Sequence, residues 1–396
     1  MKEVVIIDGV RTAIGKLGGS LINETADYLA EKVISALVER TGIDRSEVDE
    51  VILGQAKQSA DQSNVARVAA LRANIPIEVP AYTVHRQCGS GLQSINNAAQ
   101  QIALGLSDIV IAGGTESMST APYYIRNARY GYGAGNGLIL DPNTESQPGS
   151  QPEHYNIQTM GETAENLAQK YKISRDDQDA FAQLSQDRAH HAIEEGHFES
   201  QIIPYEVKER KSTSVFSVDE HPRLTSIEKL STLKPVFRKD GSVTAGNSSG
   251  RNDGASALLV MSKDKADQLG LKPKVKIIAQ AAAGVDPTIM GIGPVPATLK
   301  ALKQANLTIE DIDVIELNEA FAAQSLAVIE ELNLDIQKVN PNGGAIALGH
   351  PIGATGAILM TKLIHELERT GKRYGLVTLC IAGGLGISTI VENCQI

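Results

Sequence analysis

Apolar residues along the chain follow two alternating patterns. Residues 25–41 and 91–105 carry apolar positions at helical spacing, and the first segment is followed by a glycine that predicts a helix end. Short continuous apolar runs at 1–8, 51–53 and 109–111 predict strands. Buried strands that alternate with helices are typical of an α/β fold in which helices cover both faces of a sheet.

The C-terminal part of the chain shows the same alternation. Helices are predicted at 296–306 and 354–370, and strands at 314–317 and 376–381. The chain also resembles itself, because three short segments recur in the same order at offsets of 264 to 270 residues. The matched pairs are 48–56 with 312–320, 85–91 with 350–356, and 109–114 with 378–384. Collinear matches of this kind predict a duplicated architecture.

We therefore predict an α/β protein built from two duplicated halves. The first half comprises residues 1–119 and 243–268, and the second comprises 269–396. Residues 120–242 are predicted to form an inserted loop domain, with an amphipathic helix at 175–195. A long insertion between two strands is more often functional than incidental.

The charge distribution excludes some functions. A formal net charge of −10 argues against a nucleic-acid groove, which requires clustered lysine and arginine. Residues 208–239 depart from this average with eight basic and four acidic residues. The basic residues are Lys208, Arg210, Lys211, Arg223, Lys229, Lys234, Arg238 and Lys239. Such a stretch suits a small polyanion such as a nucleotide-bearing cofactor, but an ordinary solvated loop explains it equally well.

Other features of the composition bear on location. No apolar run is long enough to predict a transmembrane helix, and the N-terminus turns acidic too early for a signal peptide. We therefore expect a soluble cytoplasmic protein. The three cysteines, Cys88, Cys380 and Cys394, cannot form a disulfide framework and have no metal-binding spacing. No metal is predicted.

Cys88 lies between a strand-like segment, 79–84, and the helix predicted to begin near Ser90. We expect Gly89 and Gly91 to permit a tight turn there. A helix N-terminus favours a thiolate, so the pKa of Cys88 is predicted to be lowered. The competing interpretation is a small residue that fits a crowded turn, and the turn alone does not decide between them.

The second half carries further polar residues at equivalent places. His350 occupies the turn that matches the Cys88 turn, Cys380 ends a predicted strand, and Asn318 follows another. Ligands bind at the carboxyl ends of strands in open α/β sheets. A pseudo-twofold pairing of the halves would therefore place two cysteines and a histidine in one active site.

At several places the sequence resembles the signature motifs of the thiolase family, and the similarity extends from the first strand to the end of the chain. The matching segments are 88–93, 113–118, 244–250, 318–324 and 342–356. The resemblance implies a five-layer αβαβα fold. It also implies a two-step ping-pong reaction that makes or breaks carbon–carbon bonds between acyl groups carried on coenzyme A.

The same resemblance implies a role for each site residue. Cys88 corresponds to the nucleophile that is acylated, and His350 to the histidine that takes the thiol proton. Cys380 corresponds to the cysteine that moves the α-proton of acetyl-CoA. Asn318 would hold a water in one oxyanion hole, and the backbone N–H groups of Cys88 and Ala382 would form the other.

Binding residues and assembly are also implied. Ser249, Arg223 and the basic stretch fall where coenzyme A lies in the family, and the loop around Met160 lines the acyl pocket. Coenzyme A is a substrate or product of the implied reaction, so no cofactor is expected. The run at 123–137 corresponds to an insert that joins subunits, which implies a homodimer or homotetramer.

Residues 86–88 and Gln93 favour the degradative branch of the family, whereas residues 246–255 favour the biosynthetic one, so the acyl chain length stays open. Three positions also depart from the family pattern. His85 replaces an asparagine, Ala382 replaces a glycine, and Thr159 stands where acetoacetyl-specific members have a histidine beside the methionine. Condensation of two acetyl-CoA and thiolysis of longer 3-ketoacyl-CoA both remain open. A ketoacyl synthase would need a histidine or asparagine in place of Cys380. A non-catalytic acyl-CoA-binding protein would not need the four catalytic positions.

Overall fold

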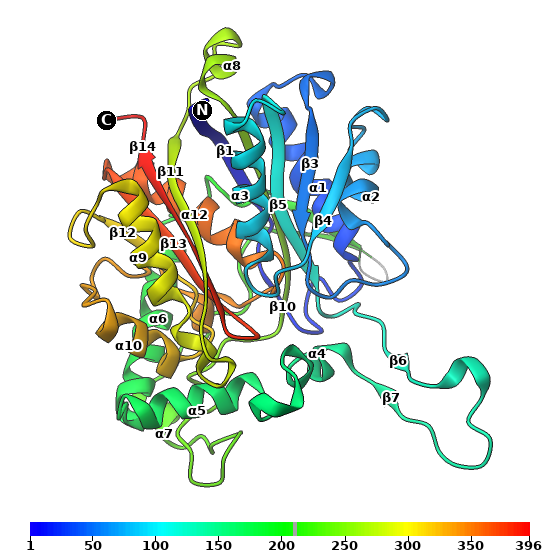
Figure 1. Ribbon diagram of the computed structural model, residues 1–396, viewed down its shortest axis with the longest axis vertical. Coiled ribbons are helices and arrows are strands. Elements are labelled where there is room, and N and C mark those ends of the chain that lie inside the picture. The colour runs from blue at the N-terminus through cyan, green and yellow to red at the C-terminus, as the bar shows by residue number, and fades with distance from the viewer. Residues whose placement is uncertain (209–211) are drawn as a thin grey trace.

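The structure, a computed structural model, describes residues 1–208 and 212–396. A ten-stranded sheet forms its centre (Figure 1). In spatial order, the first half contributes β4 (Ala81–Val84), β3 (Glu50–Gly54), β5 (Ile109–Ser117), β10 (Asn252–Ser262) and β1 (Val4–Arg11). The second half continues with β11 (Val275–Gly284), β14 (Leu385–Asn393), β13 (Tyr374–Ile381) and β12 (Val314–Leu317). A short strand, β2 (Gly15–Lys16), pairs with β10.

The two halves pair their strands in the same way. β1–β10 and β10–β5 are antiparallel, whereas β5–β3 and β3–β4 are parallel. β11–β14 and β14–β13 are likewise antiparallel, and β13–β12 is parallel. In the second half, the position equivalent to β4 is occupied by a single parallel bridge, which joins Ile315 of β12 to Val339. The halves join through the antiparallel pair β1–β11. The segments matched in sequence fall on equivalent elements, so the duplication is confirmed.

Helices separate and cover the two halves of the sheet. α3 (Ser90–Ala103) packs against α12 (Thr355–Thr370) between them, and both helices share one apolar core with the strands on either side (Figure 1). The outer faces are covered by α1 (Ala26–Thr41) and α2 (Val65–Arg72) in the first half and by α9 (Pro294–Ala305) and α10 (Ala322–Glu331) in the second. This is the predicted five-layer αβαβα order.

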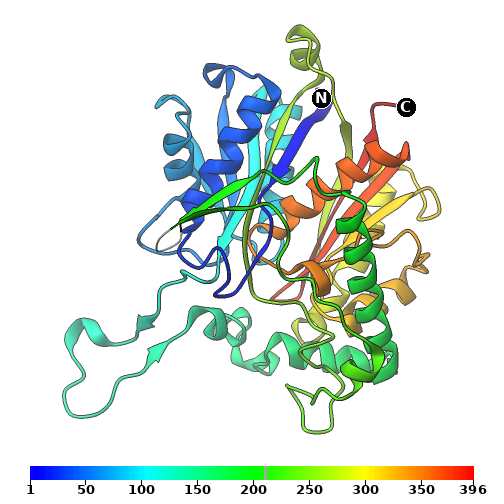
Figure 2. The ribbon, with the colours of Figure 1, turned by 180° about the vertical axis from the view of Figure 1, so that it is seen from behind.

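The segment between β5 and β10 forms most of the remaining structure. Its helices are α4 (Pro142–Glu145), α5 (Met160–Lys170), α6 (Arg175–Glu194) and α7 (Ile227–Ser231). Its hairpins are β6 (Tyr124–Ile125) with β7 (Ile139–Leu140) and β8 (Tyr205–Lys208) with β9 (Thr213–Phe216). In Figures 1 and 2 the β6–β7 hairpin projects away from the rest of the molecule, whereas α6 lies against the rest of the molecule. The remaining helices are α8 (Lys263–Gln268) and α11 (Ala345–Leu348).

A buried ion pair ties this segment to the sheet. The Arg11 guanidinium at the end of β1 donates to both carboxylate oxygens of Asp219 at 2.8 and 3.0 Å, and both side chains are buried.

Two members of the basic stretch, Arg210 and Lys211, lie outside the described residues. Within the described ranges, no helix is both long and apolar enough to cross a membrane. The predicted domain boundaries stay a prediction.

Candidate active site

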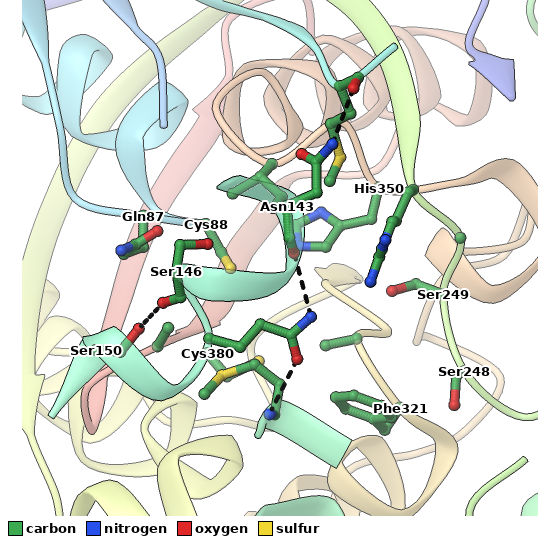
Figure 3. Close-up of a pocket in the computed structure, with 18 of the residues that line it drawn as sticks. Gln87, Cys88, Asn143, Ser146, Ser150, Ser248, Ser249, Phe321, His350 and Cys380 are labelled. Atoms are coloured by element: carbon green, nitrogen blue, oxygen red, sulfur yellow. Dashed lines mark hydrogen bonds between the residues drawn. The ribbon is translucent and has the colours of Figure 1, made fainter. Parts of the chain in front are cut away.

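A cavity of about 290 Å³ opens where both halves and the inserted segment meet (Figure 3). Six of the eight residues predicted for the site line it. They are Cys88, His350, Cys380, Ala382, Met160 and Ser249. In Figure 3 Cys88, His350 and Cys380 are drawn around the same space, although they come from α3, α12 and β13 or the turns beside them. The predicted convergence of the three groups is therefore present.

The turn that holds Cys88 is built differently from the prediction. Its positive φ, 44°, belongs to Gln87, whereas Gly89 has the ordinary helical φ of −85°. The Ser90 hydroxyl accepts from the N–H of Arg86 at 2.8 Å and donates to the carbonyl of Gln87 at 2.6 Å, which closes the turn. Gly89 lies in the tight turn, as expected, but the positive φ is provided by Gln87 and by neither glycine.

Those glycines instead allow close packing. A Cβ at Gly89 would lie 2.5 Å from Cδ1 of Ile381, and one at Gly91 would lie 2.8 Å from the backbone nitrogen of Ala357. Both distances are shorter than real Cβ contacts. The glycines thus let the start of α3 approach β13 and α12, which brings Cys88 near the groups of the second half.

The electrostatics of Cys88 also correct the prediction. Burial raises the pKa of the Cys88 thiol, opposed by the backbone N–H of Ala382, the positive charge of Lys57 and the N–H of Cys88 itself. The sequence predicted a lowered pKa because only the helix N-terminus was visible. Desolvation by the surrounding cavity outweighs that effect. The thiol therefore predominates over the thiolate in the free enzyme at neutral pH.

His350 is built to accept a proton. Burial lowers the pKa of His350 to about 4, so the ring is neutral at pH 7. Its Nδ1 lies 2.6 Å from the hydroxyl of Thr355, and that hydroxyl donates to the carbonyl of Pro351 at 2.9 Å. A hydroxyl has one hydrogen, so Thr355 accepts from an Nδ1–H. Nε2 is then the unprotonated nitrogen, and it has no partner among the described residues.

Cys380 is the most deeply enclosed of the three groups. It lies near the end of β13 and is 1% exposed. Burial raises the pKa of Cys380 far above its ordinary value, and the nearby Cys88 raises it further. Cys380 therefore rests as a thiol, which can donate a proton.

Asn318 and Arg223 do not line the cavity. Asn318 directly follows β12 and is fully buried, and neither atom of its amide has a hydrogen-bond partner among the described residues. Buried amides are nearly always paired, so this one is suited to hold a small polar ligand such as water. Arg223 is exposed and donates to the carbonyl of Ala245 at 3.3 Å.

Thr159 also lies outside the cavity wall. Its hydroxyl caps α5 by accepting from the N–H of Glu162, and the Glu162 carboxylate accepts from the N–H of Thr159 at 2.7 Å. The neighbouring Met160 is the residue that lines the cavity. Thr159, one of the three departures from the family pattern, therefore caps a helix and does not line the cavity.

The sequence analysis missed one polar wall of the cavity. Lys57 lines it together with Asn143, Ser146, Gln147 and Ser150 from the inserted segment. Lys57 follows the carboxyl end of β3, so the strand-end rule that identified Asn318 could have found it. The other four lie in a turn-rich run whose composition is that of an ordinary surface loop, and no pattern marks them.

Comparisons with known proteins agree with this geometry. The family model for the thiolase N-terminal domain matches residues 4–264, and that for the thiolase C-terminal domain matches 271–393. The chain belongs to the thiolase family. The thiolase prediction is confirmed, and the protein is an acyltransferase.

Relatives match over nearly the whole chain. An acetyl-CoA acetyltransferase of Syntrophomonas wolfei is 48% identical and covers 99% of both chains. The crystal structure of the Bacillus anthracis acetyl-CoA acetyltransferase has a TM-score of 0.97 at 50% identity, with 99% of each chain covered. Human mitochondrial 3-ketoacyl-CoA thiolase has a TM-score of 0.95 at 44% identity and the same coverage. Thiolases with either name therefore share this fold.

Proposed function

We propose that this thiolase transfers acyl groups between coenzyme A thioesters through an acyl-enzyme on Cys88. It condenses two acetyl-CoA to acetoacetyl-CoA and, in the reverse direction, cleaves 3-ketoacyl-CoA with coenzyme A. The activity belongs to fatty acid metabolism. Coenzyme A is substrate and product, and no other cofactor takes part.

The arrangement around the Cys88 sulfur carries this proposal. The backbone N–H groups of Ala382 and Cys88 both oppose the rise in the pKa of the Cys88 thiol, which supports their proposed role as donors near the sulfur. After the sulfur has bonded to a carbonyl carbon, donors at that place suit the carbonyl oxygen that becomes negative. The free Nε2 of His350 lines the same cavity. Nucleophile, base and oxyanion donors are thus collected in one site.

In the first half-reaction, the Cys88 sulfur attacks the thioester carbonyl and its proton passes to Nε2 of His350. The tetrahedral intermediate collapses, and coenzyme A leaves as a thiol after taking that proton. A neutral thiol and a neutral imidazole suit this transfer because no ion pair needs to exist beforehand in a poorly solvated cavity.

In the second half-reaction, the Cys380 thiol first passes its proton to Nε2 of His350, and the Cys380 thiolate then takes a proton from the α-carbon of a second acetyl-CoA. The resulting enolate attacks the acyl group on Cys88, and the Cys88 sulfur leaves and takes the proton from His350. In thiolysis the Cys380 thiol returns that proton to the leaving enolate. A water held by Asn318 would donate a hydrogen bond to the thioester oxygen as charge develops there. The burial of Cys380 and the unpaired amide of Asn318 support these roles.

The coenzyme A moiety is proposed to lie over Ser249 and the basic stretch that contains Arg223. Ser249 lines the cavity, and Arg223 is exposed, as expected for a phosphate contact.

The projecting β6–β7 hairpin exposes Tyr123, Tyr130, Leu138 and Ile139 to solvent. Exposed apolar patches mark interaction sites. We propose that it joins subunits into a homodimer or homotetramer, and that the protein works in the cytoplasm.

A preference for longer 3-ketoacyl-CoA is the second candidate. Part of the cavity wall is apolar, formed by Met160, Val236, Phe237, Met290 and Phe321. Methionine side chains adapt to ligands of different shape. This wall supports the binding of acyl chains beyond four carbons.

Acylation by acetyl-CoA tests the proposed function directly. The expected result is one acetyl group on Cys88, detected by intact mass and peptide mapping, with release of one equivalent of free coenzyme A. Cys394 is exposed, so a Cys394→Ser background removes adventitious labelling. Cys88→Ala in that background should take up no label. Acetylation of Cys380 with Cys88 unmodified would overturn the assignment.

A further inference from the structure

Lys57 is a buried cation beside the nucleophile. Its residue is 7% exposed, yet its side chain lines the same cavity as Cys88. The ammonium donates to the carbonyl of Pro142 at 3.2 Å and to the hydroxyl of Ser146. Both acceptors are neutral. A buried lysine is ordinarily paired with a carboxylate.

The acidic groups near Lys57 are engaged elsewhere. Glu116 accepts the N–H of Lys57 at 3.0 Å through one oxygen, and the N–H groups of Ala56 and Gly353 at 3.0 and 2.8 Å through the other. Asp141 pairs with Arg251 at 3.9 Å. Neither forms an ion pair with the Lys57 ammonium within 4.0 Å in the described part of the chain. Glu116 therefore fixes the backbone of Lys57, and its negative charge acts on the ammonium only from beyond ion-pair distance.

The side chains that line the cavity suit an anionic ligand. The described residues that line the cavity include one lysine, Lys57, and one arginine, Arg251, but no aspartate or glutamate. The Ser146 hydroxyl accepts from Lys57, which leaves its own hydrogen available to a ligand. In Figure 3 Ser146 and Ser150 are drawn beside Cys88, and Ser248 and Ser249 on the other side of the cavity. Ser146 and Ser150 are thus drawn apart from Ser249, over which coenzyme A is proposed to lie.

We propose that Lys57 and Ser146 form a subsite for acyl groups that carry a carboxylate at the end distant from the thioester. This inference rests on the proposed function, because the acyl group is held as a thioester of Cys88. An acyl carboxylate would gain a charge-assisted hydrogen bond from the ammonium and one from the hydroxyl. The apolar wall around Met160 and Phe321 offers no such donor. The subsite therefore selects dicarboxylic acyl groups over alkyl groups of the same length.

Acylation of Cys88 by succinyl-CoA and by butyryl-CoA compares the two classes at equal chain length. In each case the Cys88 sulfur replaces the coenzyme A sulfur on the acyl carbon, and coenzyme A leaves with the thiol proton. Intact mass spectrometry gives both rate constants. The expected succinyl-to-butyryl ratio exceeds one and falls about tenfold or more in Lys57→Met, which is what the loss of a hydrogen bond to a charged group predicts. Lys57→Arg should keep most of the preference.

Controls separate this role from the alternatives. Lys263→Met removes an exposed lysine on α8 and should leave both rates unchanged. If Lys57→Met slows both acylations by the same factor, Lys57 serves the Cys88 thiolate and the proposal is overturned. If Lys57→Met does not fold, Ser146→Ala decides, because an unchanged ratio in that variant also refutes the subsite. Failure of acetyl-CoA to label Cys88 would overturn the proposed function itself.

Discussion

Thr355→Val removes the hydroxyl that orients His350. In the native protein the Thr355 oxygen accepts from Nδ1–H at 2.6 Å, because its own hydrogen is donated to the carbonyl of Pro351. That bond selects the tautomer whose Nε2 can take the Cys88 proton. Thr355 is buried, at 3% exposure, and valine has nearly the same shape, so the space remains filled while the hydroxyl is lost. The change is therefore mainly the loss of two hydrogen bonds, and only the one from Nδ1–H bears on the tautomer of His350.

The size of the effect follows from the unpaired Nδ1–H. A buried donor left without a partner costs about 1–3 kcal/mol. The competing tautomer, protonated on Nε2, avoids this cost. The reactive tautomer then becomes about five- to 150-fold less populated relative to the native protein. We expect kcat for thiolysis of acetoacetyl-CoA to fall by about ten- to hundredfold, with KM changed less than about twofold.

Steady-state kinetics and the rate of Cys88 alkylation at pH 7 measure this effect, and both rates should fall together. Thr355→Ser is the matched control because it keeps the hydroxyl and should retain activity within about threefold of native. Thermal unfolding identifies any loss of folded protein. The reasoning would be refuted by equal activity in the valine and serine variants, or by a valine variant that loses only substrate affinity.

Four further outcomes are expected. Cys380→Ser should abolish carbon–carbon bond cleavage yet allow acetyl transfer to Cys88 in the mass assay; equal loss of both steps in a folded variant would contradict the division of roles. 3-Oxohexanoyl-CoA should be cleaved alongside acetoacetyl-CoA, since each added methylene in an apolar pocket contributes about 0.8 kcal/mol, and undetectable kcat/KM for the longer substrate would show a closed pocket. Light scattering should give a dimer or tetramer at micromolar concentration, and a monomer would count against the β6–β7 contact. Burial lowers the pKa of His350 to about 4 from 6.5, so its neutral form stabilises the fold above pH 6.5 and that stability is lost as the pH falls toward 4. As the pH falls from 6.5 to 5, the free energy of unfolding, measured by chemical denaturation, should decrease by about 2 kcal/mol less in His350→Gln than in the native protein. An equal decrease in both proteins would refute this.

The sequence by itself determined the architecture, because the relevant information is local or repeated. Apolar spacing depends only on neighbours along the chain, so α1 begins and ends within a residue of its predicted limits, with Gly42 in the left-handed conformation at its end. The collinear repeats identified equivalent strands before any contact was known. Cys88, His350 and Cys380 were also found in sequence, since Cys380 ends a predicted strand and the other two lie in matching turns before predicted helices.

Only the tertiary structure decided the properties that depend on what surrounds a side chain. The sign of the pKa shift of Cys88 is set by burial in a cavity formed by distant segments, and the helix start visible in sequence is the weaker influence. The tautomer of His350 depends on the hydrogen bond that its Nδ1–H donates to Thr355, and the exposure of Lys57 to the cavity depends on where the inserted segment folds back. Lys57 looks like an ordinary loop lysine in sequence because its neighbours there are polar, whereas its neighbours in space are the groups of the active site.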